Sequence, residues 1–351
     1  MQLISKYRFK LTGAGAGIWL RSLNIIAILI VLTACSQGGN NESDADAEAE
    51  ISKPKGMYTS SFGGASALDH ESVRGGLIRV KWQDLEPLQG QFDFSKVEEQ
   101  LVEIKSRGLN WSLAVIGGGT SPDWLIDSVG VDFFEIIDGE GSPRNLPKIW
   151  DPRVNENLMA LAQELAATYG IDDKLVLVYI PQMTKNGIEG HFNGLSTYFL
   201  GGVGLIEDRW VDGVKETARI FTEAFASKAI AVELHEIAGS ADIPARLMRE
   251  LWEEPKFNQR VGVGIWWLSG KESYQSSLLD ILAVFSGDIY AQVIGRSDEP
   301  ERFEGGDYRA IFAQAETLGA RYIEAWEYEF KQDTFPAAFE EFNEYVDAVY
   351  Q

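Results

Sequence analysis

The sequence is poor in side chains that bind metals or form covalent cross-links. Among 351 residues it contains one cysteine, Cys35, and three histidines, His70, His191 and His235. A disulfide needs two cysteines and a thiolate zinc site needs several, so neither can form within this chain. The histidines lie far apart in the sequence, and no other spacing is typical of metal ligands. We therefore expect no metal site and no cofactor.

Positive charge is also scarce. The chain has 31 lysines and arginines against 53 aspartates and glutamates, which gives a formal net charge of −22. Phosphate backbones bind to basic surfaces, so we expect no nucleic-acid partner. The same charge would repel polyanionic substrates unless the site is locally basic, whereas neutral saccharides are compatible with it. With 45% apolar residues, the chain has enough hydrophobic area to fold.

The apolar run at residues 25–32 is too short to span a bilayer as a permanent helix but long enough for a signal-peptide core. It ends in Leu32-Thr33-Ala34-Cys35, which resembles a bacterial lipobox. We therefore expect residues 1–34 to be a lipoprotein signal peptide and Cys35 to carry a lipid that attaches the protein to a membrane. The alternative is a buried cysteine that follows a hydrophobic segment. The basic residues that precede the cysteine fit a signal peptide; they are Lys6, Arg8, Lys10 and Arg21.

Residues 35–56 are predicted to be a flexible acidic tether. This segment combines Ser, Gly, Asn and Ala with several carboxylates, and such a composition cannot bury a core. Ser36, not an aspartate, follows the cysteine, which by resemblance to lipoprotein sorting rules favours the outer membrane. The sequence leaves the membrane face open.

From residue 57 onward, β-rich runs alternate with amphipathic helical segments, the pattern of parallel βα units. Eight such units favour an α/β fold of the (β/α)8 type, a TIM barrel over residues 57–351, and an open doubly wound sheet is the alternative. The eight predicted strands are 57–62, 77–82, 110–116, 175–180, 229–234, 261–268, 289–294 and 321–326.

Polar and aromatic motifs follow several of these strands, where the active sites of such barrels lie. Arg79 is on the second strand, and the motif Trp82-Gln83-Asp84-Leu85-Glu86-Pro87 follows it, with Gly90 three residues later. After the third strand comes Pro122-Asp123-Trp124-Leu125. The chain here resembles a clan A glycoside hydrolase, notably the barrel of the family 42 β-galactosidases. The resemblance covers about residues 76–195.

The resemblance implies a catalytic acid/base glutamate after the fourth strand, and Glu189 is the best match. In the family an asparagine directly precedes that glutamate, whereas here Asn186 lies three residues before it. Glu189 could instead be an ordinary solvated loop residue. The family's nucleophile belongs at the end of strand seven, where this chain has Gln292. The nearest inward candidate is Glu324 on strand eight, which could alternatively be a buried partner of Arg79.

Strand five offers another carboxylate pair, Glu233 and Glu236, next to His235. Substrate binding is assigned to residues near strand ends, because tryptophan rings stack on sugars and Arg79 keeps a neighbouring carboxylate ionised. Each tryptophan could equally be packed in the core. The assigned residues are Arg79, Trp82, Trp124, His191, Trp266 and Trp326.

Together these features predict a glycoside hydrolase that acts on an oligo- or polysaccharide with Glu189 and Glu324 as its carboxyl pair. Such a reaction needs one protonated and one ionised carboxyl group; a separation of about 5–5.5 Å implies retention and about 6.5–9.5 Å inversion. The alternative is a non-catalytic barrel lipoprotein that binds glycans.

Overall fold

The structure is a computed structural model that describes residues 51–60, 65–138, 141–192 and 194–350. The predicted signal peptide, the lipidation site Cys35 and most of the predicted tether lie outside these residues. Among the helices that are described, none is both long enough and apolar enough to cross a membrane.

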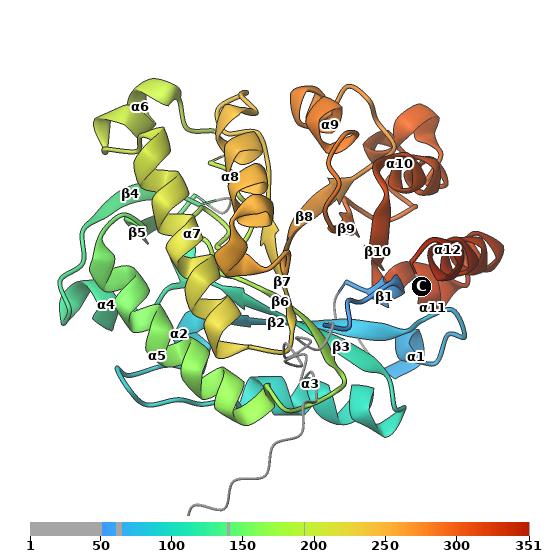
Figure 1. The fold of residues 1–351 in the computed structure, drawn as a ribbon, viewed down its shortest axis with the longest axis horizontal. Helices are drawn as coiled ribbons and strands as arrows, with labels where there is room; N and C mark the ends of the chain where they lie inside the picture. Colours follow the sequence, from blue (N-terminus) through green and yellow to red (C-terminus); the bar gives the residue numbers. More distant parts are fainter. Residues whose placement is uncertain (1–50, 61–64, 139–140, 193, 351) are drawn as a thin grey trace, which may run out of the picture. The chain divides into compact units, whose positions relative to one another are not determined.

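Eight parallel strands close into a barrel in the order β1-β10-β9-β8-β7-β6-β3-β2 (Figure 1). The ring closes where Tyr58 of β1 pairs with Gly75 of β2. All eight predicted strands are present, and the closed order confirms the (β/α)8 barrel and excludes the open sheet. The strands are β1 (Gly56–Thr59), β2 (Gly75–Lys81), β3 (Asn110–Ile116), β6 (Leu175–Tyr179), β7 (Ala229–Glu233), β8 (Val261–Leu268), β9 (Ile289–Val293) and β10 (Ala320–Ala325).

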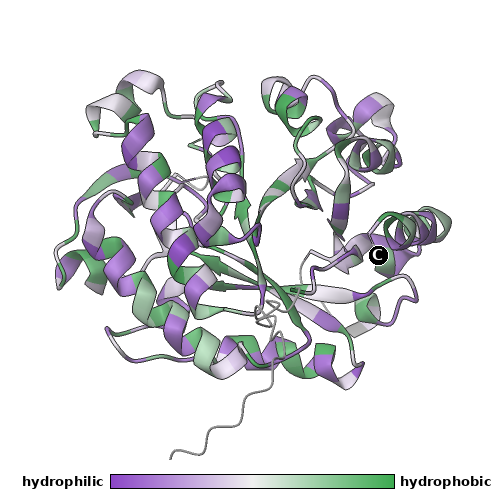
Figure 2. Ribbon diagram, viewed as in Figure 1, coloured by the Kyte–Doolittle hydropathy of each residue, from purple (hydrophilic) through white to green (hydrophobic). Residues whose placement is uncertain are grey.

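Helices cover the outside of the barrel (Figure 1). Their apolar sides pack on the outward faces of the strands, and the outer helices carry both hydrophilic and hydrophobic residues (Figure 2). The longer helices are α3 (Ser95–Ser106), α5 (Pro152–Tyr169), α7 (Glu207–Ala224), α8 (Asp242–Glu253), α10 (Ala310–Leu318) and α12 (Pro336–Val349). Shorter ones are α1 (Ala65–Leu68), α2 (Trp82–Leu85), α4 (Trp124–Asp127), α6 (Thr197–Gly202), α9 (Ser276–Leu282) and α11 (Glu327–Gln332).

Large aromatic side chains fill the barrel interior because glycines on neighbouring strands leave room for them. A Cβ atom on Gly262 of β8 would lie 2.6 Å from a ring carbon of Tyr290, and one on Gly264 would lie 3.1 Å from the ring of Tyr179. The interior is therefore a packed core up to its C-terminal mouth, where the chain's polar inward residues begin.

Two features differ from the sequence prediction. An antiparallel hairpin, β4 (Phe133–Ile137) and β5 (Pro143–Pro147), lies between β3 and α5 and was not predicted. Phe134 and Ile136 alternate with exposed neighbours and pack into the core, so the period-two signal was present but short. The last residues of the predicted tether also contact the barrel: Lys53 pairs with Asp288 at 2.5 Å, and Arg321 donates to the carbonyl oxygen of Pro54.

Candidate active site

The loop after β6 carries Glu189 and His191, and a glycine contact fixes its path. Gly187 has a φ of +84°, and a Cβ atom there would lie 2.3 Å from the carbonyl oxygen of Gly117, which follows β3. The Gly187 carbonyl oxygen accepts the backbone N–H groups of Gly117 at 2.8 Å and Gln182 at 3.0 Å. Only glycine permits both the positive φ and this approach, so the loop packs directly against the end of β3.

Hydrogen bonds to two side-chain amides, those of Asn186 and Gln182, hold this loop so that Glu189 faces the barrel mouth. Asn186 Oδ1 accepts the backbone N–H of Glu189 at 3.0 Å, which is an Asx-type turn. Gln182 Nε2 donates to the carbonyl oxygens of Ile188 and Glu233, both at 2.7 Å. Asn186 therefore shapes the turn before Glu189, although it does not directly precede that residue as in the family 42 pattern.

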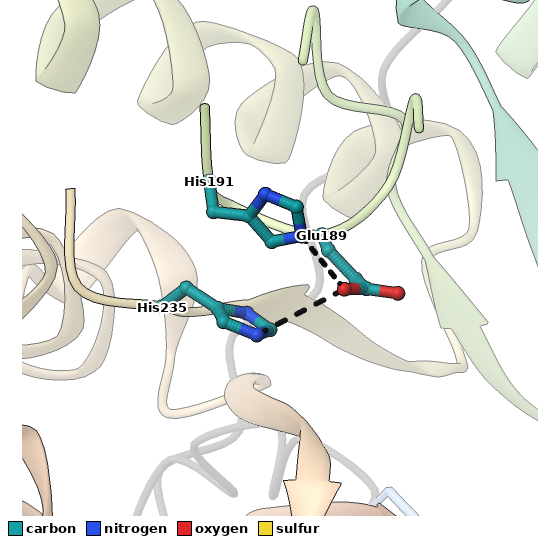
Figure 3. Close-up of side chains that lie close together, drawn as sticks. All are labelled: Glu189, His191 and His235. Carbon is teal, nitrogen blue, oxygen red and sulfur yellow. Dashed lines mark hydrogen bonds and ion pairs between the residues drawn. The ribbon is translucent and has the colours of Figure 1, made fainter. Parts of the chain in front are cut away.

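Glu189, His191 and His235 point toward one another where this loop meets the end of β7 (Figure 3). His191 Nε2 lies 2.9 Å from Oε2 of Glu189, and His235 Nε2 lies 3.8 Å from the same oxygen. The side chain of Glu189 is 26% exposed, whereas both histidines are nearly buried. Glu189 is thus an inward-facing group that ligands can reach from the mouth.

Glu233 contacts this cluster from the end of β7 and fixes the position of His235 and of the Glu189 loop. Its fully buried carboxylate accepts the backbone N–H groups of Gly190 at 2.7 Å and Trp266 at 3.1 Å, and it lies 2.8 Å from Nδ1 of His235. These contacts hold the loop and the His235 ring in place, which is the role of a positioning residue. Glu236 accepts the backbone N–H of Ser277 and holds a turn. Both glutamates of the alternative pair on strand five thus accept backbone hydrogen bonds.

The charges around Glu189 and His235 determine which of the two side chains is protonated. Burial would raise the pKa of Glu189, but the hydrogen bond from His191 and the positive charges of His235 and Arg79 outweigh it and lower that pKa. Burial would lower the pKa of His235, but the carboxylates of Glu233 and Glu189 outweigh it and raise that pKa. Glu189 is consequently held in its ionised form.

Glu324 occupies the inward face of β10 and is fully buried. The Tyr322 hydroxyl donates to its Oε1 at 2.6 Å, and Gln292 Nε2 donates to its Oε2 at 2.7 Å. Burial outweighs these two hydrogen bonds and the charge of Arg79, and it raises the pKa of Glu324 to about 7. Gln292, at the expected nucleophile position, thus serves as a hydrogen-bond donor to Glu324.

Arg79 links the two acidic groups. Its guanidinium Nε donates to the carbonyl oxygen of Ser60 at 3.0 Å, and its Cζ lies 5.1 Å from the centroid of the Trp266 ring. Burial lowers the pKa of Arg79, while the charges of Glu324 and Glu189 both act to raise it. One half-buried cation is therefore within electrostatic range of both carboxyl groups.

Trp82 and Trp124 do not line the mouth, so their assignment to substrate binding is wrong. Trp82 is fully buried, and its indole N–H donates to Glu86 Oε2 at 3.0 Å. Trp124 packs edge-on against Trp82 with ring centroids 6.1 Å apart, and it donates to the carbonyl oxygen of Glu86. The Trp-x-x-Leu-Glu motif therefore builds a structural cluster directly after β2. In this cluster the two indole rings pack against each other and both donate hydrogen bonds to Glu86.

The other two predicted tryptophans lie near the mouth. Trp266 is inside the barrel, and the Arg79 guanidinium lies over its ring. Trp326 directly follows β10, is half-buried, and donates to the carbonyl oxygen of Val293 at 2.8 Å. Of these two, Trp326 has the more accessible ring.

Sequence reasoning missed a basic pocket of about 330 Å³ beyond the ends of β2 and β3. It is lined by Lys81, Gln83, Gly119, Thr120, Asp138, Arg144 and Lys185. Arg144 pairs with Asp138 at 3.0 Å, whereas Lys81 and Lys185 form no salt bridge with any residue that the structure describes. Lys81 follows Arg79 at the two-residue spacing that places side chains on one face of a strand, a signal that the sequence already contained.

The expectation that the histidines are too far apart to share a metal is wrong for two of the three. The fold brings donor atoms of Glu189, His191 and His235 within 4.8 Å of one another. His70 is elsewhere, 3.2 Å from Asp333. Separation along the chain was a poor guide, because the loops after β6 and β7 are neighbours at the mouth of the barrel.

No protein-family model and no curated protein matches this chain. Among solved structures, the catalytic domain of a β-amylase from Paenibacillus polymyxa is similar with a TM-score of 0.56 and 11% identity, over 85% of this chain and 98% of that one. A β-galactosidase from Bacillus circulans sp. alkalophilus is similar with a TM-score of 0.51 and 10% identity, over 78% of this chain and 50% of that one. The chain thus has a barrel fold that glycoside hydrolases use. Identities this low establish the fold alone.

Proposed function

We propose that this protein hydrolyses a glycosidic bond at the C-terminal mouth of its barrel, with Glu189 and Glu324 as the two carboxyl groups. The observation that carries the proposal is geometric: Glu189 lies in the loop after β6 and is 26% exposed, while Glu324 is held on β10 by hydrogen bonds from Tyr322 and Gln292. Hydrolysis of this kind requires one protonated and one ionised carboxyl group on either side of the scissile bond. The barrel architecture shared with glycoside hydrolases supports the same proposal.

Glu324 fits the role of general acid. A carboxyl group with a pKa of about 7 holds its proton for part of the time at neutral pH and can transfer it to a leaving oxygen. Glu189, the exposed member of the pair, fits the role of base or nucleophile. This assignment reverses the roles that the family resemblance suggests, in which the glutamate after the fourth strand is the acid.

Because Glu324 is fully buried, the proposal requires a side chain at the mouth to move when substrate binds, and we assign this movement to Arg79. The hydrogen bonds that hold Arg79 go to one carbonyl oxygen, that of Ser60. A sugar hydroxyl can replace such a bond more easily than it can replace an ion pair with a carboxylate. Arg79 would then bind the sugar while it uncovers the acid.

The basic pocket favours an acidic saccharide as substrate. Lys81 and Lys185 line it together with Arg144, and Lys185 belongs to the same loop as Glu189. In a chain with a net charge of −22, a local group of cations next to the site would offset the repulsion of carboxylate- or sulfate-bearing sugars. Glycans with uronic acid or sulfate groups are therefore the first substrates to test.

The test replaces Glu189, the more accessible carboxyl group of the pair. Glu189→Gln should lower turnover by roughly 10²–10⁴-fold, the usual contribution of proton transfer or of its base. Glu327→Gln is a matched control, because this nearby glutamate pairs with Lys331 at 3.3 Å within α11. Equal turnover by the wild type and Glu189→Gln would reject the assignment.

A glycan-binding protein without activity is the second candidate. Gln292 stands where the resemblance expects the nucleophile, and it donates a hydrogen bond to Glu324. Calorimetric binding of an oligosaccharide that the protein fails to cleave over long incubation would favour this candidate.

We further propose that the protein is attached to an outer membrane through lipid on Cys35. The lipobox-like Leu32-Thr33-Ala34-Cys35 and the acidic segment behind it support this. Mass spectrometry of the membrane-extracted protein should find an N-terminus at Cys35 with added acyl chains. A Cys35→Ser variant should be released from the membrane fraction, and its retention would contradict the proposal.

A further inference from the structure

We propose that Glu189, His191 and His235 form a binding site for one divalent transition-metal ion of the zinc class. The inference does not depend on the proposed hydrolysis, because it rests on the arrangement of donor atoms alone. It assigns to this barrel mouth a ligand that the fold similarity does not suggest.

The donor atoms are already close to a metal-binding geometry. His191 Nε2 and His235 Nε2 lie 2.9 Å and 3.8 Å from Glu189 Oε2, and all three donor atoms lie within 4.8 Å of one another. In a tetrahedral zinc site with bonds of about 2.0–2.1 Å, neighbouring ligand atoms are about 3.3 Å apart. Small side-chain rotations therefore suffice to place an ion among them.

A second layer of contacts orients His235 for this role. Its Nδ1 lies 2.8 Å from Glu233, so an N–H on Nδ1 donates to that carboxylate and Nε2 faces Glu189, where it gives up its proton when it binds a metal. Glu233 cannot rotate away, because its oxygens also accept the N–H groups of Gly190 and Trp266. A carboxylate–histidine–metal arrangement of this kind is what metal sites use to fix ring orientation.

The donor set selects the metal class. Two imidazoles and one carboxylate suit zinc, and they bind magnesium or calcium poorly because those ions prefer oxygen ligands. Three protein ligands leave a fourth position for water or a sugar oxygen. Glu189 is the partly exposed member, so an ion can enter from the mouth.

The site is preorganised by the same contacts that shape the loop. The Glu189-Gly190-His191 segment is fixed by the Asn186 turn on one side and by the Gly190–Glu233 hydrogen bond on the other. His235 comes from the neighbouring loop, which adds a ligand from an independent element. Little chain entropy is lost on binding, which favours affinity.

Binding of Zn²⁺ to the purified protein, stripped with chelator, is measured by competition with a chromophoric chelator. The expected result is one ion per chain, with tight binding abolished in His235→Ala and in His191→Ala. Glu233→Gln removes no direct ligand and should weaken binding by roughly 10–100-fold through the orientation of His235. His70→Ala is the matched control and should bind as the wild type does.

Absorption of the Co²⁺-loaded wild type gives a readout that needs no variant. Intense visible bands expected of four-coordinate cobalt would support the site, and a spectrum equal to that of hexaaqua cobalt would overturn it. Zn²⁺ binding that survives in the His191→Ala, His235→Ala double variant would overturn it as well. Because none of these measurements uses turnover, failure of the metal site and failure of the proposed hydrolysis are distinguishable.

Discussion

Glu324→Gln should change how the stability of the protein depends on pH. The carboxyl group of Glu324 titrates at about 4.5 when unfolded and at about 7 in the folded barrel. Below pH 4.5 both states hold the proton and the group has no effect. Between pH 4.5 and 7 the unfolded state has lost its proton while the folded state keeps it, so the free energy of unfolding falls as the pH rises.

The magnitude follows from the size of that pKa difference. Each pKa unit corresponds to about 1.4 kcal/mol, so the wild type should lose about 3 kcal/mol across this interval through Glu324 alone. The side-chain amide in the Glu324→Gln variant cannot ionise and is free of this loss. That amide also provides only one acceptor oxygen for the donors on Tyr322 and Gln292, which lowers the stability of the variant by a constant amount at all pH values.

Urea unfolding of both proteins at several pH values from 4.5 to 8.5 measures this effect. The difference in unfolding free energy between Glu324→Gln and wild type should rise by about 3 kcal/mol in favour of the variant and level off above pH 7. Titrating groups that do not interact with Glu324 are common to both proteins and cancel in the difference, and burial raises the pKa of the interacting Tyr179 and Tyr322 above this pH range. Parallel curves would refute the claim that burial raises the pKa of Glu324.

The site leads to three further predictions. Lys81→Ala and Lys185→Ala should weaken binding of an acidic oligosaccharide measured by calorimetry while leaving a neutral one unaffected; equal losses for both sugars would contradict a role for their charge. Gly187→Ala should destabilise the fold by roughly 1–3 kcal/mol in urea unfolding because of its positive φ and close approach to Gly117, and an unchanged midpoint would show that the loop relaxes. Zn²⁺ should inhibit hydrolysis in proportion to its occupancy, because it binds the carboxylate of Glu189, and a chelator should restore the rate; stimulation by Zn²⁺ would contradict this.

The strands of the barrel could be predicted because they are largely buried on both faces and are therefore rich in apolar and β-branched residues. Residues 110–116 and 261–268 match β3 and β8 at both ends. The inward direction of Glu324 also follows from alternation with Tyr322, because side chains two residues apart lie on one face of a strand. Local periodicity is sufficient for features of this kind.

Features that depend on contacts between distant segments could not be predicted. The meeting of His191 with His235 depends on which loops are adjacent around the barrel mouth. Trp82 was assigned to the substrate because tryptophans near strand ends suit sugars, yet its hydrogen bond with Glu86 and its contact with Trp124 place it in the core. Residue type alone does not tell a buried ring from an accessible one.

The central claim is that the barrel mouth cleaves glycosidic bonds. The most direct test incubates the wild-type protein in ¹⁸O-labelled water with a panel of neutral, uronic-acid-containing and sulfated oligosaccharides, followed by mass spectrometry of the products. The account predicts shortened sugars that carry the label at the new reducing end, and far less product from Glu189→Gln. Saccharides that bind the wild type tightly and are recovered intact would contradict it.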